Sequence, residues 1–95
     1  MTFDYTLQLY KQGMSIPDIA EERSMAVSTI RGHLSKWVKA GEISAFDLLG
    51  KERVEKIWKE MEKSQAISLG DLKHEMPFEV DYYELRWVRS HFIKE

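Results

Sequence analysis

Apolar residues recur at helical spacing along most of the chain, and the clearest stripe lies between residues 28 and 40. Four apolar side chains at i, i+4, i+7 and i+8 share one face of a helix: Ile30, Leu34, Trp37 and Val38. Polar or small residues take the opposite face: Arg31, Gly32, Ser35, Lys36 and Lys39. The pattern predicts a helix from about Ser28, a candidate N-cap, to Ala40, followed by Gly41 as the helix end.

Two shorter helical segments precede this one. The first is expected over about residues 4–12, with Gly13 placed to end it in a left-handed conformation. Ser15 and Asp18 have the spacing of a capping box and open a second, short helix that stops near Arg23. Residues 24–26 then form a tight turn into the third helix.

The second half of the chain is also predicted to be helical. A short helix is expected through residues 45–49, a longer one over about 51–63, a capped short helix after Ser68 and a final helix from Asp81. The expected inner stripe of the final helix is Leu85, Val88 and Phe92. Residues 42–50 have neither alternating strand residues nor a glycine hairpin turn, so no wing is expected.

The predicted fold is therefore all-α: a tri-helical helix-turn-helix without a wing, extended by further helices, about five to six helices in all. We expect one domain over residues 1–95, with the helix-turn-helix in residues 1–41 and the helical extension in residues 42–95. A helix-turn-helix needs a small residue where its helices cross and a tight turn between them. Ala20 is that small residue, and Ser24 stands where glycine is the commoner choice. The apolar residues expected to lock the two helices together are Ile16, Ile19, Met25, Ile30 and Leu34.

Charge is unevenly distributed along the chain. The formal net charge is −2, which is unusual for a nucleic-acid-binding domain. Residues 23–41, however, contain four basic residues and no acidic one, whereas residues 42–95 contain twelve acids against nine bases. The segment around the third helix therefore has the local positive field that attracts a phosphate backbone.

Other function classes receive little support from the residues. The chain has no cysteine, and its three histidines lack partners at metal-ligand spacing. It has no glycine-rich phosphate loop and no nucleophile motif, so we expect no catalytic residue, metal or cofactor in this segment. No apolar run is long enough to span a membrane, and we expect a cytoplasmic protein.

Five segments together resemble a known family: Thr6–Gly13, Ile16–Arg23, Ser28–Leu34, Gly41–Ile43 and Tyr82–Arg86. They are similar to the helix-turn-helix domain found at the C-terminus of bacterial RecQ-type DNA helicases and at the end of related small bacterial proteins. The stretch from residue 28 to 34 also resembles the recognition helices of LuxR-type regulators. The resemblance implies a DNA-binding accessory domain, with any ATP-dependent catalysis in a helicase core, either in the same chain or in a separate one.

These observations predict binding to DNA, duplex in preference to single-stranded, through the third helix. The candidate DNA-binding residues are Ser28, Thr29, Arg31, Gly32, Ser35, Lys36 and Lys39. The first five are expected to face the groove, with Arg31 as the side chain able to contact guanine through two hydrogen bonds. Lys36 and Lys39 are expected to contact the phosphate backbone. The alternative is a protein–protein interaction module that uses the same helical scaffold.

Overall fold

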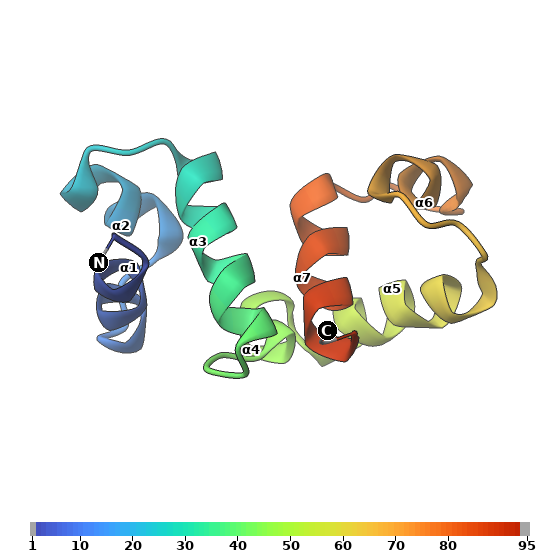
Figure 1. The fold of residues 1–95 in the computed structure, drawn as a ribbon, viewed down its shortest axis with the longest axis horizontal. Helices are drawn as coiled ribbons and strands as arrows, with labels where there is room; N and C mark the ends of the chain where they lie inside the picture. The colour runs from blue at the N-terminus through green and yellow to red at the C-terminus, as the bar shows by residue number, and fades with distance from the viewer. Residues whose placement is uncertain (1, 94–95) are drawn as a thin grey trace.

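The computed structural model describes residues 2–93, with side chains from Asp4 onward, and within this range the chain forms helices and no strand (Figure 1). The helices are α1 (Thr2–Lys11), α2 (Ile16–Arg23), α3 (Val27–Lys39), α4 (Ala45–Leu49), α5 (Lys51–Lys63), α6 (Leu69–Glu75) and α7 (Tyr82–Phe92). The all-α prediction and the absence of a wing between α3 and α4 are confirmed for these residues. The structure describes seven helices, one for each segment predicted to be helical, so the expected total of five to six was too low.

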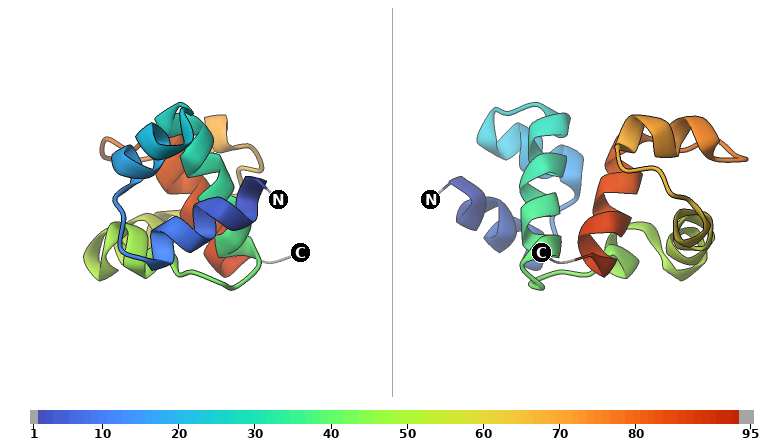
Figure 2. Two further views of the ribbon diagram at one scale, coloured as in Figure 1. Left: turned by 90° about the vertical axis from the view of Figure 1, so that its left-hand side faces the viewer. Right: turned by 45° about the vertical axis from the view of Figure 1, so that its right-hand side comes forward.

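Two three-helix units lie against each other along the long axis of the molecule, which measures 38 × 23 × 22 Å. The first unit is α1–α2–α3, the second is α5–α6–α7, and α4 connects them at the base of α3 and α7 (Figure 1). The most extensive contact between two helices is that of α3 with α7. The right view in Figure 2 agrees with Figure 1 that α3 and α7 lie side by side at the centre and run in the same direction, and in the left view α7 lies behind α3. The third helix of one unit therefore packs on the third helix of the other.

Side-chain caps determine where several helices begin. The hydroxyl oxygen of Ser15 accepts a hydrogen bond from the Asp18 backbone N–H at 3.3 Å, and that of Ser68 accepts one from Asp71 at 3.1 Å. Each such bond satisfies one N–H that the helix itself leaves unpaired. The expected cap at Ser28 is wrong: α3 begins one residue earlier, at Val27, with Ala26 as its N-cap, so Ser28 lies within the first helical turn.

The turn between α2 and α3 is made by Ser24 in a left-handed conformation, with φ 54° and ψ 45°. The next residue, Met25, donates its backbone N–H to the carbonyl of Ala20 at 2.9 Å, which closes the end of α2. Ala20 is buried, as expected for the small residue where α2 crosses α3. The turn thus has helix-turn-helix geometry although it lacks the usual glycine.

The core is one continuous cluster that includes residues of both units. In α3 the predicted stripe residues Ile30, Leu34 and Val38 are fully buried, whereas Trp37 is only partly buried. In α7 the predicted stripe is wrong at Phe92, which is 38% exposed. Trp87, on a different side of α7, is buried instead, because α7 packs against α5 and α6 on one side and against α3 on another.

Candidate nucleic-acid interface

Most of the predicted DNA-binding residues of α3 lie on one solvent-facing side. Ser28, Thr29, Lys36 and Lys39 are exposed. Gly32 lies among them, and a Cβ atom added there would meet no other atom within 4 Å. The spacing of residues 28, 32, 36 and 39 follows the helical repeat, so these positions form a continuous strip along α3. The residues of this strip are small and uncharged near the start of α3, and they are cationic near its end.

Two predicted residues turn away from this strip toward α7. Ser35 is buried, and its hydroxyl donates to the backbone carbonyl of Arg31 at 3.2 Å. The guanidinium carbon of Arg31 lies 3.9 Å from the centroid of the Tyr83 ring. Trp87 Nε1 donates to the same Arg31 carbonyl at 3.1 Å. The expectation that Ser35 faces outward is therefore wrong, because α7 covers this side of α3.

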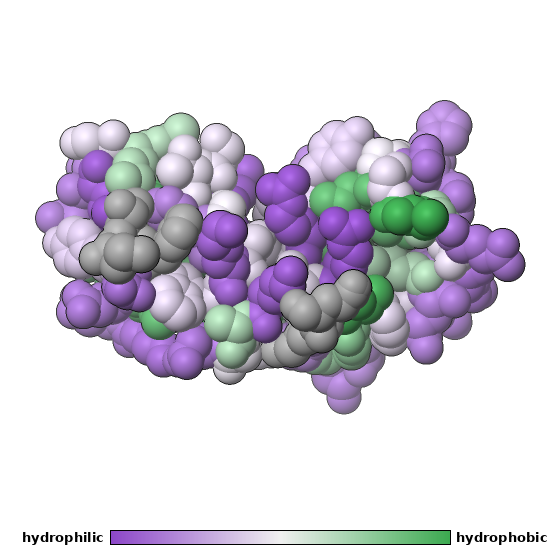
Figure 3. Space-filling model, in the orientation of Figure 1, coloured by the Kyte–Doolittle hydropathy of each residue, from purple (hydrophilic) through white to green (hydrophobic). Residues whose placement is uncertain are grey.

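The exposed side of α7 continues the surface begun by α3. Exposed or partly exposed residues recur along α7 and just beyond it at the same helical spacing as on α3: Tyr82, Arg86, Arg89, Ser90 and Ile93. A groove of about 360 Å³ is lined by Ser28 and Gly32 of α3 together with Tyr82 and Arg86 of α7. The exposed sides of the two helices thus meet along one seam. Hydrophilic residues gather along this seam in the middle of Figure 3.

We call this surface the α3–α7 face, and its composition is strongly cationic. It is formed by Ser28, Thr29, Gly32, Lys36, Lys39, Tyr82, Arg86, Arg89 and Ser90. α3 contains no acidic residue. The acidic residue of α7, Glu84, is buried and accepts two hydrogen bonds from Arg53, at 2.8 and 3.0 Å. Asp81, which precedes α7, is an exposed carboxylate that lines the groove of this face, but the four cations Lys36, Lys39, Arg86 and Arg89 outnumber it, so the face has a local positive field.

Sequence reasoning missed Arg86 and Arg89 as part of this surface. Two features of the sequence could have indicated a cationic surface on α7: the two arginines have i, i+3 spacing, and no acidic residue occurs from Leu85 to Ile93. Nothing in that pattern indicates that α7 lies beside α3, since this depends on packing between residues about 50 positions apart. Arg89 already has one hydrogen bond within the fold, since its Nη1 donates to the Ile67 carbonyl at 3.2 Å. Arg86 is the exposed cation of α7.

A buried polar contact holds α1, α2 and α3 together behind the α3–α7 face. Arg23 Nη1 donates to the Thr6 hydroxyl oxygen at 2.6 Å, and that hydroxyl lies 2.9 Å from His33 Nδ1. Since the Thr6 oxygen accepts from Arg23, its own proton is available to His33, which fits a neutral imidazole with Nδ1 as acceptor. Burial, with a smaller effect of the Arg23 charge, lowers the pKa of His33 below its usual value. His33 is therefore a structural residue of α3.

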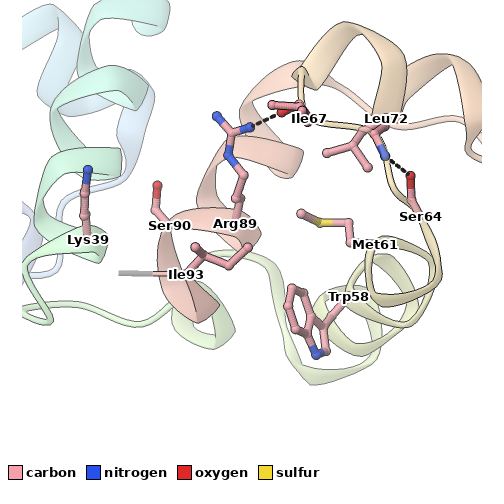
Figure 4. A pocket seen from close by; sticks show the side chains of 10 residues that line it. Lys39, Trp58, Met61, Ser64, Ile67, Leu72, Arg89, Ser90 and Ile93 are labelled. Carbon is pink, nitrogen blue, oxygen red and sulfur yellow. Dashed lines mark hydrogen bonds between the residues drawn. The ribbon is translucent and has the colours of Figure 1, made fainter. Parts of the chain in front are cut away.

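A second hollow, of about 520 Å³, lies at the C-terminal ends of α3 and α7, and Figure 4 shows its lining. Trp58 and Met61 of α5 lie on one side, and Lys39 of α3 lies across from them, beyond Ser90. Ile67, in the segment between α5 and α6, is 89% exposed at the rim. This end of the molecule is thus more apolar than the centre of the α3–α7 face.

The described residues contain no group of three or more His, Cys, Asp or Glu side chains that could hold a metal ion. None of their helices has the length and apolar character needed to cross a bilayer.

Comparison with protein families gives one match. Residues 2–89 match the model of a family described as a helix-turn-helix domain, so the match includes both three-helix units. Comparison with curated proteins and with solved structures gives no match. Helix-turn-helix domains in general bind DNA, and the surface described above is compatible with that activity. The family match spans most of the chain and agrees with the α2–turn–α3 geometry, and the chain therefore belongs to this helix-turn-helix family.

Proposed function

We propose that the protein is a DNA-binding accessory domain that docks α3 on duplex DNA. The observation that carries the proposal is the α3–α7 face: two parallel helices whose exposed side chains are cationic, small or hydroxyl-bearing, on a chain of net negative charge. A positive surface of this kind attracts the phosphate backbone even where the whole chain is acidic.

The exposed strip of α3 has residues suited to a helix that lies in a groove. Ser28 and Thr29, at its start, are the side chains positioned to meet base edges, as the N-terminal residues of recognition helices do. The open space over Gly32 allows a close approach. Lys36 and Lys39 lie further along, where they would contact phosphates.

The position of Arg31 changes what kind of binding we propose. Its guanidinium lies over Tyr83, at the border between α3 and α7, and Ser35, which donates to the Arg31 carbonyl, is buried. The residue best suited to contact guanine is thus held at the edge of the exposed strip. We therefore propose that phosphate contacts dominate and that discrimination between DNA sequences is weak.

The resemblance to RecQ-type helicase C-terminal domains supports a role beside a helicase core. In that role this segment supplies DNA affinity, and the ATP-dependent catalysis belongs to the core, in the same chain or in a separate one. With about three to five phosphate contacts available, the expected dissociation constant of the segment alone is on the order of micromolar or weaker.

Two lysine variants test the proposal with the same change of charge. Lys39 and Lys59 are both exposed, each on a 13-residue helix, but Lys59 lies on α5, outside the α3–α7 face. Lys39→Gln should weaken binding to all short duplexes alike and reduce the slope of log K against log salt by about one. Lys59→Gln should leave the affinity for duplexes and the salt slope unchanged. Equal effects of the two variants would mean that binding, if present, does not use α3.

One observation favours the alternative, a protein–protein interaction module. Ile67 and Ile93 are exposed apolar residues that line the hollow shown in Figure 4, and Phe92, also exposed, stacks on Trp58 of the same lining. Isolated exposed apolar residues are ordinary, but a group beside a hollow is typical of protein contacts. Backbone chemical shifts recorded during titration with duplex DNA distinguish the two functions: shifts on α3 and α7 support DNA binding. Absence of any shift with DNA would favour the interaction module.

A further inference from the structure

The groove between α3 and the beginning of α7 has a composition suited to an anion. Four of its lining residues come from α3 and four from the start of α7: Ser28, Arg31, Gly32, Ser35, Asp81, Tyr82, Tyr83 and Arg86. Its volume is about 360 Å³. It is open to solvent between the exposed residues Ser28 and Tyr82, the latter being 51% exposed. Two arginines from different three-helix units thus line one open groove.

The charges around this groove do not cancel. The guanidinium carbon of Arg31 lies over the Tyr83 ring, 3.9 Å from its centroid, and this contact holds the cation beside the groove. Asp81 is the carboxylate among the lining residues, and it caps α7 by accepting from the backbone N–H of Glu84. Glu84 itself is buried and bonded to Arg53. The groove therefore combines two cations with one carboxylate that is already hydrogen-bonded.

The distance between two packed helices, compared with the width of the major groove of DNA, indicates where the α3–α7 groove would lie on a duplex. Packed helices are about 8–10 Å apart, whereas the major groove of B-DNA is about 12 Å wide and admits a single helix. If α3 lies along the major groove, the parallel helix α7, whose exposed side points the same way, must lie over the adjoining phosphate backbone. The seam between α3 and α7 then follows the edge of the major groove.

We propose that the α3–α7 groove binds a backbone phosphate of the same duplex on which α3 docks, with Arg86 and Arg31 as its donors. This inference rests on the proposed DNA-binding function and adds α7 to the binding machinery. Arginine suits this role because its fork of N–H donors matches the oxygens of a phosphate. The groove thereby makes the second three-helix unit a direct participant in DNA binding.

The test uses the 95-residue chain with Arg86→Gln, Arg86→Lys and, as a matched loss of one exposed cation elsewhere, Lys59→Gln. Binding to a short duplex of mixed sequence is measured by fluorescence anisotropy at several salt concentrations. Arg86→Gln should reduce the salt slope by about one and the affinity roughly five- to tenfold near physiological salt. Arg86→Lys should retain the slope, and Lys59→Gln should resemble the original chain. Circular dichroism melts check that each variant is folded.

The outcomes separate this inference from the function on which it rests. If the original chain binds no duplex, the proposed function fails, and the inference with it. If the chain binds and Arg86→Gln behaves like Lys59→Gln, the function stands and the phosphate groove is wrong. Titration with inorganic phosphate alone distinguishes a site for free phosphate from a site for the phosphate backbone of DNA. A saturable response to phosphate that Arg86→Gln abolishes, with duplex binding unchanged, would overturn the DNA assignment of the groove.

Discussion

The guanidinium of Arg31 lies over the ring of Tyr83, with its central carbon 3.9 Å from the ring centroid, and this contact joins the two three-helix units. A second contact reinforces it, because Trp87 Nε1 donates to the backbone carbonyl of Arg31 at 3.1 Å. Tyr83 also packs edge-to-face on Trp87, with ring centroids 4.9 Å apart. Arg31 of α3 thus contacts α7 through both its side chain and its backbone.

A double-mutant cycle with Arg31→Met and Tyr83→Leu should detect this contact. A cation over an aromatic ring at a partly exposed site contributes about 0.5–1 kcal/mol, so the two substitutions together should destabilise less than the sum of their separate effects by about that amount. Urea unfolding of the four proteins measures the coupling energy. Additive effects would show that the contact between Arg31 and Tyr83 does not contribute to stability.

The first unit could be predicted closely from the sequence, because its signals are local. The stripe of Ile30, Leu34 and Val38, the cap at Ser15 and the turn at Ser24 each depend on residues a few positions apart. The site could be predicted only in part. Its α3 strip follows from the helical repeat, but Ser35 has no local feature that marks it as buried.

The burial of Ser35 and the contribution of Arg86 arise from the packing of α7 on α3. A single stripe of Leu85, Val88 and Phe92 describes a helix buried on one side, whereas α7 is buried on two. Trp87 faces α3 and Phe92 stacks on Trp58, with ring centroids 4.3 Å apart. A periodicity argument assumes one buried face and so cannot place a helix that lies between two others.

Ser24→Gly should stabilise the protein. Ser24 has a left-handed backbone with φ 54°, which costs an L-residue roughly 1–2 kcal/mol and costs glycine almost nothing. Glycine loses more backbone entropy on folding, so the net gain in the free energy of unfolding should be roughly 0.5–1 kcal/mol. Thermal and urea unfolding measure it. Ser24→Val, with a branched side chain at the same backbone angles, should destabilise, and a gain in stability with valine would contradict this explanation.

His33 should make the stability of the fold depend on pH in the weakly acidic range. Burial, and secondarily the charge of Arg23, lowers the pKa of His33 in the folded state below 6.5. The unfolded chain therefore binds a proton more readily, so the free energy of unfolding is highest above about pH 6.5 and falls as the pH is lowered toward the folded-state pKa. Urea unfolding between about pH 7.5 and 5.5 should show a steeper loss than in His33→Asn. Parallel pH curves for the two proteins would refute this role of His33.

Arg53→Met should destabilise more than Glu84→Gln, although both break the same ion pair. Burial alone would raise the pKa of Glu84, but the hydrogen bonds from Arg53 and the Asp81 backbone outweigh it and lower that pKa. Removing Arg53 leaves a carboxylate that is 8% exposed without its partner, whereas Arg53 itself is more exposed and can be solvated. Arg53→Met should therefore lower the free energy of unfolding by about 2–3 kcal/mol. This is less than the loss expected for a fully buried pair, because solvent screens Arg53.

The double variant Arg53→Met/Glu84→Gln is the control for this comparison. Because it removes the stranded charge, it should recover part of the stability lost in Arg53→Met. The ion pair also predicts acid sensitivity: its stabilisation is present above the usual pKa of a glutamate and is lost as the pH falls through the lowered pKa of Glu84. Equal stability of the two single variants at neutral pH would contradict the account.

The salt dependence of duplex binding by the unmodified chain is the most direct test of DNA docking through the α3–α7 face. Fluorescence anisotropy with one short duplex, recorded from low to physiological salt, gives the slope of log K against log salt. Three to five phosphate contacts predict a slope of about −2.7 to −4.5, because each contact releases about 0.9 of a counterion. Duplex binding whose affinity does not change over this range would contradict the account, as would a lack of measurable binding at low salt.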